Sequence, residues 1–295
     1  MIFRKLKLIF VAVGLLLLII LFLNPIDTFL TEESGEGGQE LIVRMLDMGQ
    51  GDAVLLEKAG EFVLIDSGDV TYRPKFKEYL KKYHVKTLES VIITHPHADH
   101  IGGMLMAFGM TDVKRVYDNG DTIPSYIYQT YRKVIDKKQI PRQILKGGQK
   151  IQLLPGVSFD VAAPLYKSAV KNENSRQNNN SIAGKLKYGN FTMFFTGDAE
   201  KEEEEAILKS GADIKSIVLK VGHHGSKSST TKKFLDVVAP KEALISCGSG
   251  NSYGHPNKSV TGRLEKAGAR IYRTDRDGTI TIKTDGKTYQ VIKEH

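Results

Sequence analysis

Four side chains that commonly bind metal ions lie within six residues of this chain, in the segment HPHADH (95–100). The apolar run VIIT (91–94) precedes it and predicts a buried strand, so the segment begins where a strand ends. In an extended segment His95 and His97 point to the same side and can share one ion. Asp99 and His100 come after a turn, which directs them toward a second ion beside the first. The alternative is a polar loop with solvated imidazoles, but six of the eight histidines lie in this segment or in the motifs described next.

Six further short motifs lie before and after this segment. In order along the chain they are LDMGQGD (46–52), LIDSG (64–68), NNNS (178–181), FTGD (195–198), LKVGHHGS (219–226) and NSYGHP (251–256). With the metal-binding segment, this series resembles the metallo-β-lactamase superfamily, and within it the extracellular hydrolase domain of the ComEC-type competence proteins. The resemblance extends from about Leu41 to about Thr284. ComEC proteins also carry a polytopic channel domain, whereas this chain has one long apolar run, which indicates a stand-alone relative without that domain.

The resemblance implies an α+β fold, the αββα four-layer sandwich, in which two mixed sheets pack face to face with helices outside. The sequence pattern suggests two related halves. Strands are expected at residues 41–46, 53–57, 62–65, 90–94 and 113–117 and, after a polar break, at 181–187, 192–195, 217–221, 243–246 and 271–273. Helices are expected at 73–83, 125–138, 201–209, 231–238 and 259–266. Polar residues 171–180 are expected to form the loop between the halves, and the glutamates at 202–205 to face solvent.

Composition divides the chain into a leader (1–30), a stalk (31–40) and a body (41–295). Arg4, Lys5 and Lys7 precede an uninterrupted apolar run over residues 8–23. This pattern favours an uncleaved anchor in the cell membrane with the catalytic body outside; a cleaved signal peptide and a secreted body are the alternative. Residues 31–40 are rich in Glu and Gly, which favours a flexible stalk.

The body is basic. Three Lys or Arg and five Asp or Glu precede residue 41, which leaves 39 basic and 29 acidic residues and a formal net charge of +10. Such a charge favours polyanionic partners, either nucleic acid bound through its phosphates or an anionic cell-envelope polymer. Solubility or retention at an anionic envelope explains the charge equally well.

The family's metal-binding positions can be carried over to residues of this chain. The first ion would be held by His95, His97 and Asp198, and the second by Asp99, His100, Asp198 and His223. Asp198 would bridge the two ions; the alternative for this residue is a helix N-cap. His224 would then face the substrate or support a ligand, although the pattern leaves open which of the two adjacent histidines binds metal.

One departure from the lactamase and glyoxalase II pattern concerns the first ion. No histidine lies between His100 and His223, where those enzymes place a ligand. Asn178 and Asn180 occupy the matching place, and a side-chain amide oxygen is a candidate ligand there; ordinary Asx turns are the alternative. The cofactor is expected to be two divalent ions, and the oxygen-rich environment makes Mn²⁺ a competitor to Zn²⁺.

The remaining motifs are expected to support the metal site. Asp66 matches an acidic residue that holds the metal loop through hydrogen bonds; the alternative is a turn residue at a strand end. Asp47, Gln50 and Asp52 form a turn that we interpret as architectural first, with Asp52 at the site as a second interpretation.

Two segments are candidates for substrate binding. Ser226 and Lys227 precede a predicted helix start and suggest a phosphate cradle, although helix capping explains the hydroxyls equally well. Asn251, Tyr253 and His255 belong to a motif of the ComEC branch, and a protonated His255 could act as general acid. Its alternative is a loop imidazole bonded to the backbone.

Two ions that share a carboxylate suit an attack by metal-bound hydroxide. The leading hypothesis is an exported, membrane-anchored phosphodiesterase or nuclease that acts on DNA, with Asp99, His224 and His255 as candidate catalytic residues. The second is a hydrolase of a small ester, lactone or phosphocholine-type substrate. The third is a non-catalytic module that binds nucleic acid or cell wall.

Overall fold

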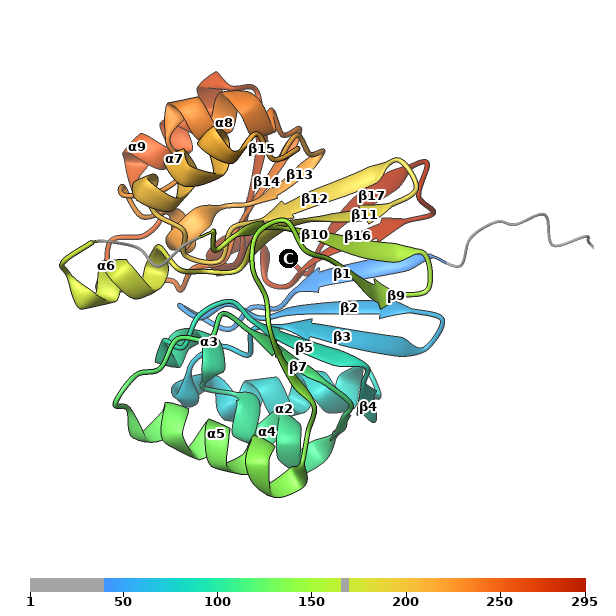
Figure 1. The fold of residues 1–295 in the computed structure, drawn as a ribbon. Helices are drawn as coiled ribbons and strands as arrows, with labels where there is room; N and C mark the ends of the chain where they lie inside the picture. Colours follow the sequence, from blue (N-terminus) through green and yellow to red (C-terminus); the bar gives the residue numbers. More distant parts are fainter. Residues whose placement is uncertain (1–39, 166–169) are drawn as a thin grey trace, which may run out of the picture. The chain divides into compact units, whose positions relative to one another are not determined.

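Two large sheets lie face to face in the computed structural model, which describes residues 40–165 and 170–295 (Figure 1). The first sheet has the order β17 (Tyr289–Lys293), β16 (Ile280–Thr284), β1 (Leu41–Met45), β2 (Val54–Lys58), β3 (Glu61–Ile65), β5 (Ser90–Ile93), β7 (Val116–Asp118) and β8 (Arg142–Ile144). The second has the order β15 (Arg270–Arg273), β14 (Glu242–Ile245), β13 (Val218–Lys220), β12 (Phe191–Phe195), β11 (Ala183–Tyr188), β10 (Val157–Ala163) and β9 (Lys150–Leu154). β4 (Thr87–Leu88) and β6 (Asp112–Val113) pair separately.

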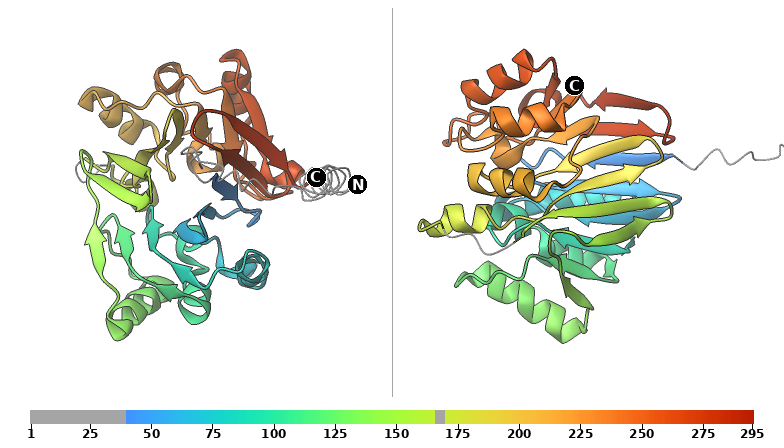
Figure 2. Two further views of the ribbon diagram at one scale, coloured as in Figure 1. Left: turned by 90° about the vertical axis from the view of Figure 1, so that its right-hand side faces the viewer. Right: turned by 45° about the horizontal axis from the view of Figure 1, so that its top comes forward.

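Helices cover the outer face of each sheet (Figures 1 and 2). The first sheet is covered by α2 (Arg73–Lys82), α3 (Ala98–Ile101), α4 (Met104–Met110) and α5 (Tyr126–Lys138). The second is covered by α7 (Lys201–Ser210), α8 (Lys232–Val238) and α9 (Lys258–Lys266). The short elements are η1 (Val70–Tyr72), α6 (Glu173–Asn178), η2 (Gly222–Gly225) and α10 (Thr274–Asp277). The predicted αββα sandwich is therefore confirmed.

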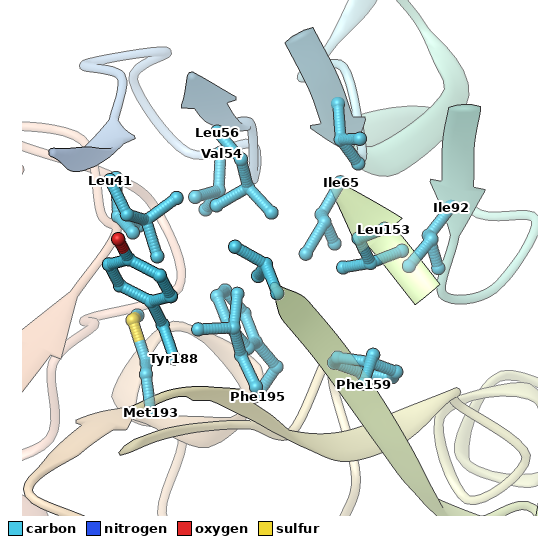
Figure 3. Close-up of a cluster of buried hydrophobic side chains, with 14 of the residues drawn as sticks. Leu41, Val54, Leu56, Ile65, Ile92, Leu153, Phe159, Tyr188, Met193 and Phe195 are labelled. Atoms are coloured by element: carbon cyan, nitrogen blue, oxygen red, sulfur yellow. The ribbon is translucent and has the colours of Figure 1, made fainter. Parts of the chain in front are cut away.

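Alternating side chains explain why both faces of each sheet are covered. In β3, Val63 and Ile65 enter the core between the sheets, while Phe62 and Leu64 face the helices. Phe195 of β12 meets that central core from the other sheet, whereas Phe194 packs outward on α8. Figure 3 shows the central core, where Val54, Ile65 and Ile92 of the first sheet meet Leu153, Phe159 and Phe195 of the second.

The division into two sequential halves is only partly right. The hairpin of β16 and β17 returns from the end of the chain and pairs antiparallel with β1, with Leu41 opposite Thr284. β8, β9 and β10 lie in the stretch interpreted as a polar break, and α6 lies within the expected loop 171–180. β8 is short and its Ile144 is exposed, so its sequence has no clear apolar face.

The glutamate cluster on α7 is not uniformly solvated. Glu203 and Glu204 are only 4% and 0% exposed, which corrects the expectation for these two residues. The Glu204 carboxylate accepts hydrogen bonds from the backbone amides of Thr230 and Thr231, just before α8. A buried carboxylate therefore ties α7 to the loop that follows β13.

The expected anchor and almost all of the expected stalk lie outside the described residues. Within residues 40–165 and 170–295, no helix has the length and apolar character needed to cross a membrane.

Candidate metal centre

The candidate site residues follow the carboxyl ends of strands from both sheets. His95 comes two residues after β5, and Asp66 directly follows β3. Asp198 comes three residues after β12, while His223 and His224 lie in η2 after β13. Parallel pairing of β3 with β5 and of β12 with β13 brings these ends to one edge of the sandwich.

Asp198 is the centre of the site. One of its oxygens, Oδ2, lies near the Nε2 atoms of four imidazoles, at 3.4 Å for His100, 3.6 Å for His224, 3.7 Å for His223 and 3.9 Å for His95. The Asp198 carboxylate is buried, and its other oxygen has no hydrogen-bond partner. Burial raises the pKa of Asp198, but His100, His224 and His223 lower it more, so the pKa lies well below its usual range. A carboxylate in this position can serve two ions.

Asp99, His100, Asp198 and His224 form a compact cluster in which one ligand atom of each lies within 4.8 Å of the others. The Nε2 atoms of His100 and His224 are buried without hydrogen-bond partners. Buried polar atoms rarely remain unpaired, and a divalent transition metal ion would satisfy these. The donor set of two imidazoles and two carboxylates fits such an ion.

His95 and His97 lie next to each other, and His95 is close to Asp198 as well. His95 Nε2 is 2.9 Å from His97 Nδ1, as expected for side chains on the same side of an extended segment. Of the two asparagines considered as ligands, Asn178 lines the adjoining pocket, and its Oδ1 is buried without a partner. Asn180 also has an unpaired Oδ1, but it is not among the residues that line the pocket, so Asn178 is the better placed of the two.

Asp66 holds the metal loop through hydrogen bonds. Its carboxylate accepts from the Thr94 backbone amide at 2.8 Å, from Thr94 Oγ1 at 2.7 Å and from His100 Nδ1 at 2.8 Å. These bonds direct His100 Nε2 toward Asp198, because the two nitrogens lie on opposite sides of the ring.

The sequence left open which of the two adjacent histidines binds metal. It favoured His223 for the second metal set, whereas the compact cluster contains His224. The backbone explains why both are close to the site. Both residues have positive φ, 47° for His223 and 53° for His224, so the alternation of an extended strand does not hold and both side chains turn toward Asp198.

Asp52 and Lys220 support His224 from behind. His224 Nδ1 lies 3.0 Å from the Ser246 carbonyl oxygen and 3.3 Å from Asp52 Oδ1, and Asp52 Oδ2 lies 2.6 Å from Lys220 Nζ. Both members of the ion pair are almost fully buried. Asp52 therefore contacts a histidine of the candidate metal site, in agreement with the second of the two interpretations made from the sequence. Sequence reasoning missed Lys220, although a lysine inside the apolar strand at 217–221 was a usable signal.

Glu200 has a similar place behind His223. Its Oε1 lies 3.2 Å from His223 Nδ1 and accepts a hydrogen bond from Asn178 Nδ2 at 3.0 Å. Burial raises the pKa of Glu200, but the contacts with His223 and Asn178 lower it more. Glu200 is therefore an anionic partner for His223, whose side chain is 23% exposed at the pocket. Sequence reasoning had considered only the start of a helix at this position.

A pocket of about 470 Å³ opens beside these residues and is lined in part by Asp99, Asp198, His223 and His224. Among the described residues that line it, none is Lys or Arg. Ser226 and Lys227 do not line it, which corrects the predicted phosphate cradle. The amides of Thr230 and Thr231, ahead of α8, are occupied by Glu204, so they are not available to a phosphate.

The residues of the NSYGHP motif have two roles: one shapes the loop, and two line the pocket. Asn251 Nδ2 donates to the carbonyls of Gly248 and His255, and its Oδ1 accepts from the His255 amide, so Asn251 shapes the loop and does not line the pocket. Tyr253 and His255 do line the pocket, as predicted. Burial, together with His223 and His224, lowers the pKa of His255 to about 4, which favours the neutral imidazole at pH 7.

Known proteins share both the fold and the metal loop. The model of the Metallo-beta-lactamase superfamily matches residues 46–124. ComE operon protein 3 of Bacillus subtilis is 30% identical over 261 residues, which cover 82% of this chain and 33% of that protein. Competence protein ComA of Neisseria gonorrhoeae is 28% identical over 243 residues, with 82% and 32% covered. The chain thus spans about a third of the length of these relatives. The crystal structure of YhfI, a metallo-beta-lactamase fold protein of Bacillus subtilis, superposes with a TM-score of 0.56 at 11% identity, over 83% of this chain and 100% of that one.

The chain therefore carries a domain of the metallo-β-lactamase superfamily, with the family match on residues 46–124, which include the metal loop, and the fold extending over the described residues. Within the superfamily, it is homologous over most of its length to part of the ComEC-type competence proteins. Both levels of the resemblance inferred from the motifs are confirmed.

Proposed function

We propose that the protein is a binuclear metal-dependent phosphodiesterase and that its substrate is DNA. The observation that carries the proposal is the convergence of four imidazoles on one oxygen of Asp198 beside an open pocket. Two divalent ions at this position, Zn²⁺ or Mn²⁺, would supply a nucleophile from water and stabilise charge on a phosphodiester.

The residues of the chain would divide the work between them. Asp66 and Asp52 orient His100 and His224 for metal binding. His223, with Glu200 at its Nδ1, lines the pocket and is placed to contact a substrate oxygen. His255 is neutral and can donate or accept one hydrogen bond to a substrate oxygen.

Two observations support DNA as the substrate. Two of the relatives are named as a competence protein and a recombination protein, and the body carries a formal net charge of +10, which favours a polyanion. The same pocket also favours a second candidate, a small phosphodiester or phosphocholine-type ester. Its lining contains no Lys or Arg among the described residues, and its volume suits a compact ligand.

Activity assays decide between the two substrates. The purified protein, supplied with Mn²⁺ or Zn²⁺, should be tested on single-stranded DNA, double-stranded DNA, a bis-aryl phosphodiester, a phosphocholine ester and a lactone. Cleavage of DNA that is lost in Asp198→Ala and retained in His84→Ala supports the proposal. Cleavage of the phosphocholine ester or lactone, with no DNA cleavage under either metal, overturns it.

We also propose that residues 8–23 anchor the protein in the membrane with the body exported, as the sequence of the leader suggests. The protein should then sediment with membranes in high salt, because burial of an apolar segment does not depend on ionic strength. Protease added to intact cells should remove the body. A shortened, soluble protein in the medium would show a cleaved signal peptide instead.

A further inference from the structure

Two tyrosines are unusually exposed. Tyr126 is 81% and Tyr253 71% exposed, while the other large apolar side chains that are exposed in the described residues range from 36% to 46%. A large ring left in water is informative when it adjoins a site, because exposed aromatic groups often mark binding surfaces. Tyr253 lines the pocket, and Tyr126 directly follows Ser125, which lines it too.

Tyr253 lies at the outer end of a row of rings that leads to the metal centre. Its ring is 5.7 Å from that of His255 with an interplanar angle of 17°, so the two are nearly parallel. The His255 ring is 5.7 Å from that of His223, which is 3.7 Å from Asp198 through its Nε2 atom. A base stacked on the outer face of Tyr253 would therefore be separated from His223 by the rings of Tyr253 and His255.

Tyr126 directly follows a residue of the pocket lining, on a helix that covers the first sheet. It is the first residue of α5, and Ser125 before it both lines the pocket and caps the helix by accepting a hydrogen bond from the Tyr128 amide. The cap fixes where the helix begins, so Tyr126 is held beside the pocket with its ring in solvent.

We propose that Tyr253, backed by His255, stacks on a base of single-stranded nucleic acid next to the phosphodiester held at the metal centre, and that Tyr126 stacks on a second base. This inference rests on the proposed function and specifies its substrate as unpaired strands. Every base has a π face, so stacking binds nucleic acid without sequence preference. The pocket lining offers no Lys or Arg among the described residues, so stacking would supply binding that charge does not supply there. A base inside a duplex has both faces covered and cannot stack on Tyr253 unless it is unpaired.

Equilibrium binding tests the stacking directly. A fluorescently labelled single-stranded oligonucleotide and the same strand with abasic sites are titrated with the full chain in chelator, so that binding is read without cleavage. Tyr253→Ala should bind the intact strand on the order of tenfold to a hundredfold more weakly, whereas Tyr253→Phe should bind like the parent protein. The abasic strand should bind weakly to all three. Tyr126→Ala should show a separate loss, and Val237→Ala, an exposed apolar side chain outside the pocket lining, should show none.

The outcomes separate this inference from the proposed function. DNA cleavage with metal, together with unchanged binding in both tyrosine-to-alanine variants, overturns the stacking and leaves the phosphodiesterase. Weaker binding in these variants, together with no cleavage of nucleic acid under either metal, supports the stacking and overturns the proposed function. Equal binding of intact and abasic strands, or equal losses in Tyr253→Phe and Tyr253→Ala, overturns the stacking.

Discussion

At the scale of single residues, the site depends on pairs in which a buried acceptor orients an imidazole. Asp66 orients His100, Asp52 orients His224, and Glu200 lies behind His223. In each pair the acceptor contacts Nδ1, and Nε2 faces Asp198. The metal centre is thus prepared by the fold before any ion binds.

The shared carboxylate should be the most sensitive position for metal binding. Asp198→Ala removes the oxygen near four imidazoles, so the protein should lose most of its bound transition metal by elemental analysis. The control variant His84→Ala should retain the bound metal, because His84 lies outside all of the metal-site motifs. Full metal content in Asp198→Ala would disprove the bridging role.

The two adjacent histidines should behave differently. His224 belongs to the compact cluster, so His224→Ala should lose about one ion per protein and weaken the binding of that ion on the order of tenfold or more. His223→Ala should keep both ions and lower turnover. Metal titration by calorimetry measures the stoichiometry, and the reverse pattern would restore the assignment made from the sequence.

Metal binding should depend on pH through His224. Burial lowers the pKa of this imidazole, but Asp198 and Asp52 raise it more, to about 10 from 6.5. The protonated form therefore stabilises the metal-free protein fully below about pH 6.5, and this contribution is lost as pH rises through about 10. A ligand must be deprotonated, so metal affinity should rise with pH up to about 10, with a proton released on binding. Calorimetry in buffers of different ionisation enthalpy measures the release, and its absence at pH 8 would contradict the assignment.

Residue types and spacing were enough to find Asp66, Asp99, His100 and Asp198, because each follows a recognisable strand end. They were not enough to choose between His223 and His224. The positions of these two side chains depend on the positive φ of both residues, and the pattern of residue types does not predict that backbone conformation. Glu200 and Lys220 were missed for a related reason, since their partners lie 23 and 168 residues away in sequence.

At the scale of elements, the segment between β13 and α8 carries the histidines and needs external support. Arg263 of α9 donates to the carbonyls of Ser229 and Thr230, and Glu204 of α7 accepts from the amides of Thr230 and Thr231. Two helices thus hold one loop through its backbone.

The sequence predicted these helices well, but the periodicity of β16 and β17 could not show that they would pair with β1.

Removing the carboxylate of Glu204 should destabilise the protein. Glu204→Ala leaves two backbone amides without their partner, at a cost of about 1–3 kcal/mol for each group left unsatisfied. Glu205→Ala, on the same helix but partly exposed, should change the free energy of unfolding by about 0.5 kcal/mol or less. Denaturant unfolding measures both, and equal stabilities would contradict the role of Glu204.

At the scale of the whole molecule, the described basic side chains of the body lie outside the lining of the candidate active-site pocket. The body is strongly basic, yet none of the described residues that line the pocket is Lys or Arg. Basic side chains outside the lining would therefore attract a long polyanion, while the pocket itself would engage one phosphodiester at a time.

Salt should distinguish long substrates from short ones. Cleavage of a long single-stranded DNA should fall steeply as salt rises, because binding of many phosphates releases counterions, and it should depend little on base sequence. A bis-aryl phosphodiester contacts the pocket alone and should show little change. Rates measured between low and physiological salt test this, and parallel curves for the two substrates would disprove the separation.

The direction of β1 places residue 40 and the pocket at opposite edges of the sandwich. The strand, labelled in Figure 1, begins at Leu41, opposite Thr284, and runs toward the turn of residues 49–51. Gln50 in this turn lines the pocket. Five residues of strand extend roughly 16 Å, so Glu40 joins the sandwich at the edge remote from the pocket. A bead or a fused partner coupled at residue 40 would therefore leave the entrance to the pocket unobstructed, even for a polymer too large to pass around the body.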